Sequence, residues 1–239
     1  MQNLTNKTAL ITGGSKGIGY GVAAALLAEG MKVAITSRTQ KAADEAVSEL
    51  AKIGKGEIIG IAADVRNFDS QQNAVNQVLD KWGQLDLLVA NAGIGHFASV
   101  EDMTMEQWHE TIDTNLTGVF YSIKAGLDGL KQSKGYFITI SSLAGTNFFA
   151  NGSAYNASKF GVTGFSQAAM LDLRKHDIRV TTIMPGSVAT YFNNHQPNDA
   201  DAWKIQIEDL GQMVVDLMQM HPRTLPSKIE VRPTMPPGA

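Results

Sequence analysis

Residues 8–19 read TALITGGSKGIG, and this stretch decides the fold of the 239-residue chain. The first five residues are mostly apolar or β-branched and predict a short buried strand. A glycine-rich turn follows, and helical spacing then extends over residues 18–29. Glycines let a backbone approach a phosphate closely, and a helix N-terminus offers N–H groups and a positive dipole end. This strand, turn and helix therefore predict a nucleotide-binding unit. The alternative is an ordinary tight turn.

The rest of the chain alternates strand and helix patterns. Short apolar or β-branched runs predict strands at residues 32–37, 57–64, 85–91, 136–141, 178–186 and 228–233. Helical spacing predicts helices at residues 41–53, 69–82, 105–131, about 155–175 and 199–220. Continuous apolar strands that alternate with helices imply a parallel sheet covered on both faces. We see no internal repeat or linker, and we predict one α/β domain over residues 1–239, a Rossmann-type doubly wound sheet of about seven parallel strands.

Composition excludes several functional classes. The net charge of −3 gives no basic surface for nucleic acid, and the absence of cysteine excludes disulfides and thiol catalysis. No apolar stretch approaches the roughly 20 residues of a membrane span, and the N-terminus lacks a signal-peptide pattern. We expect a soluble, cytoplasmic protein with no membrane or nucleic-acid partner. The five histidines show no ligand spacing, so we expect no metal.

A second motif lies in residues 142–159, SLAGTNFFANGSAYNASK. Ser142 follows the strand YFITIS, while Tyr155 and Lys159 are four residues apart at the start of a helix and share one face. A free tyrosine has a pKa near ~10, and a nearby cation lowers it toward values that suit a general acid. The motif thus predicts acid–base chemistry on a carbonyl oxygen held by Ser142. The alternative is a half-exposed tyrosine beside a solvated lysine.

The end of the second strand predicts the type of nucleotide. An acidic residue there would accept hydrogen bonds from an adenosine ribose and repel a 2′-phosphate, but this chain has Ser37, Arg38 and Thr39. Lys16 in the glycine-rich turn offers a second cation. We therefore predict NADP(H) rather than NAD(H), unless Lys16 and Arg38 are merely solvated.

Two further loops follow strands on the same edge of the predicted sheet. Asp64, with Val65 beside it, is placed to accept a hydrogen bond from an adenine amino group. The small residues of Asn91-Ala92-Gly93 let the chain pass close to a cofactor. Taken singly, each of these residues is also typical of a loop or a helix cap.

The ordered set of motifs resembles the short-chain dehydrogenase/reductase family. The set comprises TGGSKGIG, Asp64, NAG at 91–93, Asn115, Ser142, Tyr155-x-x-x-Lys159 and Pro185-Gly186, and it extends from Lys7 to about Thr190. TGGSKGIG and SSLAG are most similar to the 3-oxoacyl-acyl-carrier-protein reductase-like members. Those reductases often end in a Val-Asp-Gly-Gly-type tail, whereas this sequence has KIEVRPTMPPGA after its last helix.

The resemblance implies a role for each matching residue. Tyr155 would be the acid–base group, Lys159 would lower its pKa and bind the nicotinamide ribose, and Ser142, rather than Ser141, would orient the carbonyl. Asn115 would hold a water in a proton relay. The alternative for Asn115 is a buried amide that bonds its own helix. The implied cofactor site comprises Gly13, Ser15, Lys16, Gly17, Ile18, Gly19, Ser37, Arg38, Thr39, Asp64, Val65, Asn91, Ala92, Gly93, Tyr155, Lys159, Pro185, Gly186, Val188 and Thr190.

The expected activity is the NADPH-dependent reduction of a ketone on a small or acyl-type substrate. The alternatives are an NADP-linked alcohol dehydrogenase for a steroid, sugar or polyol, and a non-catalytic nucleotide-binding regulator. Residues 187–225 are expected to form a substrate-side loop and helix. Family resemblance also implies a homodimer or homotetramer. The candidate pocket residues are largely apolar: His96, Phe97, Leu143, Ala144, Phe148, Phe149, Asn151, Ser187, Tyr191 and Phe192.

Overall fold

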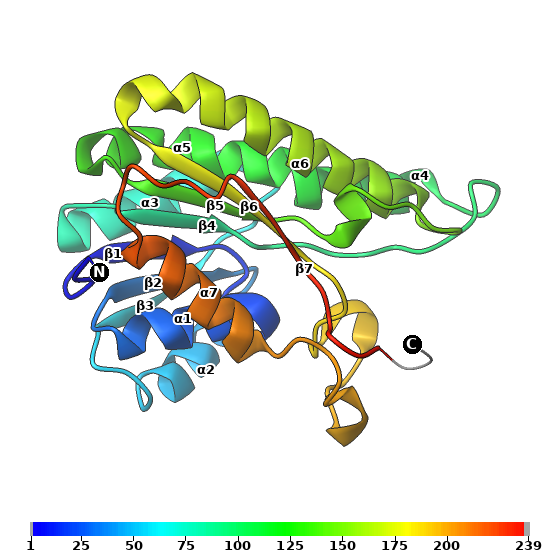
Figure 1. The fold of residues 1–239 in the computed structure, drawn as a ribbon, viewed down its shortest axis with the longest axis horizontal. Helices are drawn as coiled ribbons and strands as arrows, with labels where there is room; N and C mark the ends of the chain where they lie inside the picture. Colours follow the sequence, from blue (N-terminus) through cyan, green and yellow to red (C-terminus); the bar gives the residue numbers. More distant parts are fainter. Residues whose placement is uncertain (1, 237–239) are drawn as a thin grey trace.

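A seven-stranded parallel sheet forms the centre of the molecule, in a computed structural model that describes residues 2–236 (Figure 1). Its strands are β1 (Thr8–Ile11), β2 (Lys32–Ser37), β3 (Ile58–Ala62), β4 (Leu87–Ala90), β5 (Tyr136–Ile140), β6 (Arg179–Pro185) and β7 (Lys228–Val231). The strand order is β3-β2-β1-β4-β5-β6-β7, and every pair is parallel. This confirms the predicted doubly wound α/β fold.

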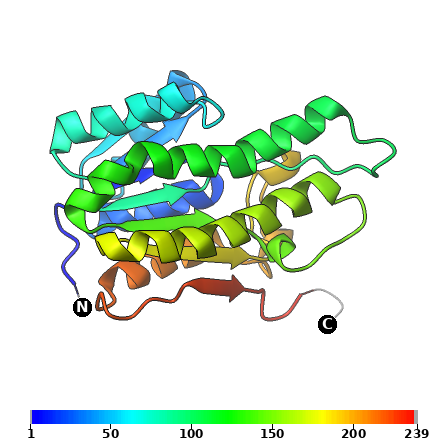
Figure 2. The same ribbon diagram turned by 90° about the horizontal axis from the view of Figure 1, so that it is seen from above.

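Helices cover both faces of the sheet. One face carries α1 (Gly17–Ala28), α2 (Gln40–Leu50) and α7 (Ile207–Gln219), and the other carries α3 (Phe68–Trp82), α4 (Met105–Ile112), α5 (Gly118–Ser133) and α6 (Ser153–Leu173) (Figures 1 and 2). Within the described residues, no helix is long and apolar enough to span a membrane.

Strand β4 shows how the sequence builds two cores. Leu87 and Val89 pack in the core beneath α1 and α7, while Leu88 and Ala90 pack in the core beneath α3 and α5. Successive side chains of a strand point to opposite faces, so a strand buried on both sides must be apolar at every position. This is why the central strands appear as continuous apolar runs.

The helix predicted at residues 105–131 is divided by a π-helical segment. This segment, Asp113–Thr117, joins α4 to α5 without a break in the helical rod (Figure 2). π segments usually occur as a single widened turn inside an α-helix, and they are frequent at functional sites. Here it contains Asn115, whose amide bonds to the backbone of Ile94 in the loop after β4.

The helix predicted at residues 199–220 is shorter than expected. A single 3-10 turn spans Asp199–Asp201, and α7 begins only at Ile207. Between them, the Ile205 backbone exchanges hydrogen bonds with Ser187 and Ala189, which holds this stretch in an extended conformation. Trp203, which falls within the predicted helix, therefore lies outside α7.

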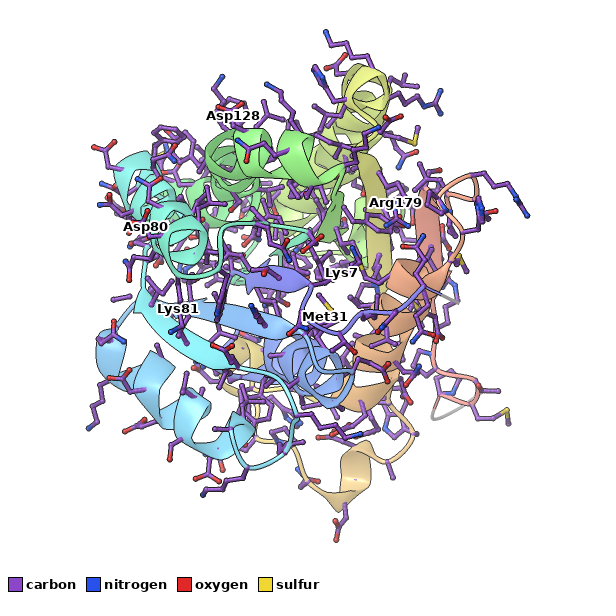
Figure 3. All side chains as sticks on the ribbon, turned by 90° about the vertical axis from the view of Figure 1, so that its left-hand side faces the viewer. Lys7, Met31, Asp80, Lys81, Asp128 and Arg179 are labelled. Atoms are coloured by element: carbon purple, nitrogen blue, oxygen red, sulfur yellow. The ribbon has the colours of Figure 1, made fainter. Side chains whose placement is uncertain are left out.

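The two ends of the parallel strands carry different kinds of residues. Figure 3 views the edge where strands begin, with Lys7, Met31 and Arg179 labelled. Lys7 forms an ion pair with Asp86 at 3.2 Å, and the Arg179 guanidinium lies 4.2 Å from the centroid of the Tyr136 ring. Loops that carry the candidate motifs follow the strands at the opposite edge, as expected for a site in a parallel sheet.

Two glycines allow α1 and α7 to touch. A Cβ atom on Gly21 would lie 2.5 Å from the carbonyl oxygen of Ile207, and one on Gly211 would lie 2.6 Å from the carbonyl oxygen of Gly21. The backbones therefore meet directly, and α7 is held against the helix that follows the glycine-rich turn.

We expect Gly21→Ala to lower the free energy of unfolding by about 1–3 kcal/mol, because the new methyl group would separate the two helices. Urea denaturation followed by circular dichroism measures this change. Gly164→Ala is the control, since a Cβ there meets nothing within 4 Å. It should stabilise α6 by about 0.5–1 kcal/mol. Equal effects of the two substitutions would contradict the assigned contact.

Candidate active site

A cleft of about 1180 Å³ opens at the carboxyl edge of the sheet. It exceeds the roughly 300–1,000 Å³ of most small-molecule pockets, and its size suits a dinucleotide together with a substrate. Most of the predicted site residues line it: Gly13, Ser15, Lys16, Gly17, Ile18, Ser37, Arg38, Thr39, Asp64, Val65, Asn91, Ala92, Gly93, Ser142, Tyr155, Lys159, Pro185, Gly186, Val188 and Thr190. Of the predicted catalytic and cofactor residues, Gly19 and Asn115 do not line it. Of the candidate pocket residues, four line it (His96, Ser187, Tyr191 and Phe192) and six do not (Phe97, Leu143, Ala144, Phe148, Phe149 and Asn151).

The glycine-rich turn has the conformation that its residues predict. Gly13 and Gly17 have positive φ values of 64° and 60°, which favour glycine. A Cβ on Gly13 would lie 2.9 Å from the Cα of Ala92, so the turn also passes close to the loop after β4. No side chain caps the first turn of α1, and no acidic residue lies in it. These features fit a pyrophosphate at the helix N-terminus.

Thr12 and Asn91 hold the turn in place. The Asn91 amide donates hydrogen bonds to the carbonyl oxygens of Thr12 and Gly13 at 2.9 and 3.0 Å. In return, the Thr12 hydroxyl accepts from the backbone N–H groups of Asn91 and Ala92. A Cβ on Gly19 would lie 2.5 Å from Asn91 Nδ2, so Gly19 makes room for this amide. Asn91 is thus a positioning residue, a role that its place in a small-residue loop did not indicate.

The residues expected at the adenosine end lie together. Ser15 donates a hydrogen bond to the Ser37 hydroxyl at 3.2 Å, and Thr39 caps α2 by accepting from the Ala42 N–H. Lys16 and Arg38 line the same part of the chain's cleft, and neither forms an ion pair among the described residues.

Asp64 already has a strong partner. The Arg66 guanidinium binds its carboxylate from Nε at 3.0 Å and from Nη2 at 2.7 Å, and this contact lowers the pKa of Asp64. Arg66 also lies 3.7 Å from Glu110, whose other oxygen is 2.9 Å from His96 Nε2. The four side chains form a polar row along the cleft. The sequence did not indicate Arg66 or Glu110, because nothing in it relates α4 to the loop after β3.

Ser142, Tyr155 and Lys159 meet in the cleft from two adjacent elements. Tyr155 and Lys159 lie on the first turns of α6, and Ser142 is the second residue after β5. The Lys159 Nζ atom lies 5.7 Å from the centroid of the Tyr155 ring and donates a hydrogen bond to the Ile140 carbonyl at 2.9 Å. The Ser141 hydroxyl is buried and bonded to the Lys159 carbonyl and to Thr163. Ser142 is therefore the serine available to a substrate.

Burial dominates the ionisation of this pair. We expected Lys159 to lower the pKa of Tyr155, but that pKa is raised, because burial disfavours the phenolate more than the Ser142 hydroxyl stabilises it. Burial also lowers the pKa of Lys159 to about 8. The spacing of the two residues could not reveal this outcome, since it depends on how the surrounding loops exclude water.

Asn115 lies just behind the cleft and is 1% exposed. Its Oδ1 atom accepts from the Ile94 N–H, and its Nδ2 atom donates to the Ile94 carbonyl and to the Ser158 hydroxyl, at 2.9 to 3.0 Å. It bonds neighbouring segments rather than its own helix. These contacts join the loop after β4 to α6, close to Lys159.

The segment after β6 also lines the cleft. Thr190 lies 3.5 Å from the position of a Cβ on Gly17, so this segment reaches the glycine-rich turn. Asp201, which is 5% exposed, binds Lys204 and His195, and these contacts lower its pKa to about 2. No group of three metal-ligating side chains is present in the described part of the chain.

Comparisons with known proteins give the same family. A family model described as short chain dehydrogenase matches residues 7–201. A 3-oxoacyl-acyl-carrier-protein reductase of Synechocystis is 40% identical over 80% of this chain and 77% of its own length. A trans-4-hydroxycyclohexanecarboxylate dehydrogenase of Sinomonas cyclohexanicum is 37% identical over 78% of this chain and 74% of its own. An alcohol dehydrogenase from the archaeon Thermococcus sibiricus, complexed with 5-hydroxy-NADP, superposes with a TM-score of 0.91 at 28% identity, over 98% of this chain and 99% of that one.

Fold and family together define an oxidoreductase of the Rossmann type with a nicotinamide cofactor. The chain belongs to the short-chain dehydrogenase/reductase family. The glycine-lined turn and the uncapped N-terminus of α1 fit such a cofactor.

The low pKa of Lys159 predicts a pH dependence of stability. In the window between about 8 and the ordinary value of 10.5, the folded chain has released this proton while the unfolded chain still binds it. Stability therefore rises with pH in this window. We expect Lys159→Met to reduce that rise by up to about 3 kcal/mol. Urea denaturation at pH values on either side of the window measures it.

Lys41→Met is the control, because Lys41 is 86% exposed at its side chain. This variant should keep the rise seen in the wild type. If Lys159→Met keeps it as well, then Lys159 has an ordinary pKa.

Proposed function

We propose that this enzyme reduces a ketone to a secondary alcohol with NADPH. The observation that carries the proposal is that Ser142, Tyr155 and Lys159 share one cleft with the glycine-rich turn. The relatives named above as a reductase and as dehydrogenases support the reaction class. Their names cover both directions of the reaction, and the proposed preference for NADPH supports the reductive direction.

The chain's own residues supply binding and proton transfer. When bound, the cofactor supplies the hydride that reduces the ketone carbon. The Ser142 hydroxyl holds the carbonyl oxygen, and the Tyr155 hydroxyl donates its proton to that oxygen as negative charge develops there. The raised pKa of Tyr155 keeps the phenol protonated before this step. Lys159 would bind the ribose and return a proton to Tyr155.

The relay role predicted for Asn115 remains a prediction. Its side-chain amide is engaged by Ile94 and Ser158, which supports a positioning role for it. By holding the loop after β4 against α6, Asn115 would keep the cofactor face of the cleft aligned with Lys159.

The preference for NADP(H) rests on two cations. Lys16 and Arg38 line the cleft at the end of β2, beside the Ser15 and Ser37 hydroxyls. Charge-assisted hydrogen bonds contribute about 1.5–3 kcal/mol each, so two of them would favour a 2′-phosphate by roughly a hundredfold or more. The related archaeal enzyme with bound 5-hydroxy-NADP supports this preference.

We also propose that residues 187–225 form the substrate side of the site and that the chain assembles as a homodimer or homotetramer. Thr190 and His195 line the cleft, which supports the first statement. The outer faces of α5 and α6 expose Phe120, Phe160 and Leu171, which supports the second, because exposed apolar patches mark protein interfaces.

Tyr155→Phe should lower kcat at least a thousandfold, because phenylalanine has no proton to donate. Ketone-dependent NADPH oxidation, followed by absorbance, measures the loss. Cofactor affinity, read from the fluorescence of bound NADPH, should change little. Retained turnover would show that Tyr155 is not the acid, and turnover of neither a ketone nor an alcohol by the wild type would favour a non-catalytic regulator.

Arg38→Asp should reverse the cofactor preference, because the new carboxylate repels a 2′-phosphate and accepts from a ribose hydroxyl. The measurement is the ratio of kcat/KM for NADPH to that for NADH, which should fall at least a hundredfold. Lys41→Asp is the control, since Lys41 is a nearby exposed cation that does not line the cleft. An unchanged ratio in the Arg38 variant would remove the basis for the NADP(H) assignment.

A further inference from the structure

Aromatic rings from three different loops form a cluster next to Tyr155, in which two rings contact Tyr155 and the third contacts one of those two. Phe97 comes from the loop after β4, Phe149 from the loop after β5, and Phe192 from the segment after β6. We call these three residues the aromatic wall.

Phe97 is the centre of the aromatic wall. Its ring centroid lies 5.4 Å from that of Tyr155, 5.9 Å from that of Phe149 and 6.3 Å from that of Phe192. The Phe192 ring is in turn 5.6 Å from Tyr155. These separations are typical of aromatic side chains in direct contact. The wall is therefore one continuous surface beside the proposed acid.

The rings of the wall are exposed although they contact one another. Phe97 is 38% exposed, Phe149 is 49% exposed and Phe192 is 37% exposed. Phe192 lines the cleft, and Phe97 and Phe149 continue this apolar patch beyond the cleft lining. A contiguous exposed apolar patch at the margin of a cleft marks a ligand surface. Phe148, the neighbour of Phe149, was expected in the pocket but does not line the cleft; it is 86% exposed and makes no ring contact within the described residues. The two adjacent phenylalanines therefore lie in different environments: Phe149 contacts another ring, and Phe148 does not.

Two other residues keep the wall in position. A Cβ on Gly95 would lie 2.6 Å from Phe192 Cζ and 2.9 Å from Phe97 Cε2, so only glycine lets these two rings meet there. The Asn156 amide donates to the carbonyl oxygens of Ala144 and Asn147 at 2.8 and 2.7 Å and fixes the loop that carries Phe149. Asn156 directly follows Tyr155, so the residue that holds this loop is the chain neighbour of the proposed acid.

Among the described residues, each basic side chain of the cleft that is not assigned to the cofactor is paired with a carboxylate. His96 is paired with Glu110, and both His195 and Lys204 are paired with Asp201. Arg66 is likewise bound by Asp64. Of the described residues that line the cleft, Lys16, Arg38 and Lys159 remain, and the proposed function assigns all three to the cofactor.

From this wall we infer that the substrate is an uncharged ketone whose carbonyl is attached to a flat or ring-shaped apolar group, such as an aryl or alicyclic ketone, rather than a linear acyl thioester. A rigid ring covers aromatic surface with little loss of rotational freedom, whereas a linear chain must order several bonds to cover the same area. This inference rests on the proposed ketone reductase activity and narrows it to one substrate class.

The test compares three methyl ketones of equal carbon number with NADPH: acetophenone, cyclohexyl methyl ketone and octan-2-one. In the wild type, kcat/KM for each ring ketone should exceed that for octan-2-one at least tenfold, which corresponds to about 1.4 kcal/mol. Phe149→Leu and Phe192→Leu keep an apolar side chain but remove the ring, and both should reduce the ratio severalfold. Phe148→Leu is the matched control and should leave the ratio unchanged. The 4-carboxylate of acetophenone should be a poorer substrate than acetophenone.

Failure of the inference is distinct from failure of the proposed function. If the wild type reduces ketones but prefers octan-2-one or a linear 3-oxoacyl thioester, or if the Phe149 and Phe148 variants behave alike, the ring preference is overturned and the reductase stands. If no ketone is turned over, the reductase fails. The ring preference is then read from the dissociation constants of acetophenone and octan-2-one by saturation-transfer NMR, where equal values overturn it.

Discussion

Every strand of the sheet runs in the same direction, and the site depends on this one constraint. Parallel pairing brings the ends of β1, β2, β4, β5 and β6 to a single edge, so residues far apart in sequence meet there. The pairing of β1 with β4 matters most. It sets Thr12 beside Asn91. Four hydrogen bonds join Thr12 and Gly13 to Asn91 and Ala92, and they fix the glycine-rich turn against the loop that reaches Asn115.

The fold and most of the site could be predicted from the sequence, because they follow from local patterns. Continuous apolar strands, helical spacing and the positive-φ glycines each indicate their own structure within a few residues. The same holds for Ser142, Tyr155 and Lys159, whose spacing places them on adjacent elements. Asp64 and Arg38 could be found in the same way, since each lies within two residues of the end of a strand.

What the sequence could not reveal depends on contacts between distant segments. The π segment at Asn115 and the extended stretch at Ile205 are set by backbone partners in other loops, and they divide or shorten predicted helices. The row from Asp64 to His96 requires α4 to lie beside the loop after β3. The raised pKa of Tyr155 likewise reflects burial by neighbouring loops, which outweighs the local effect of Lys159.

The direct backbone contact between α1 and α7 has a consequence for how such enzymes diversify. One end of the segment after β6 is fixed by the sheet, and the other is fixed by α7, which rests on the helix that receives the cofactor. Residues 190–204 therefore lie between two ends that other parts of the fold hold in place. For the proposed substrate-side role of this segment, the consequence is that its sequence can vary while its two ends keep their position relative to α1.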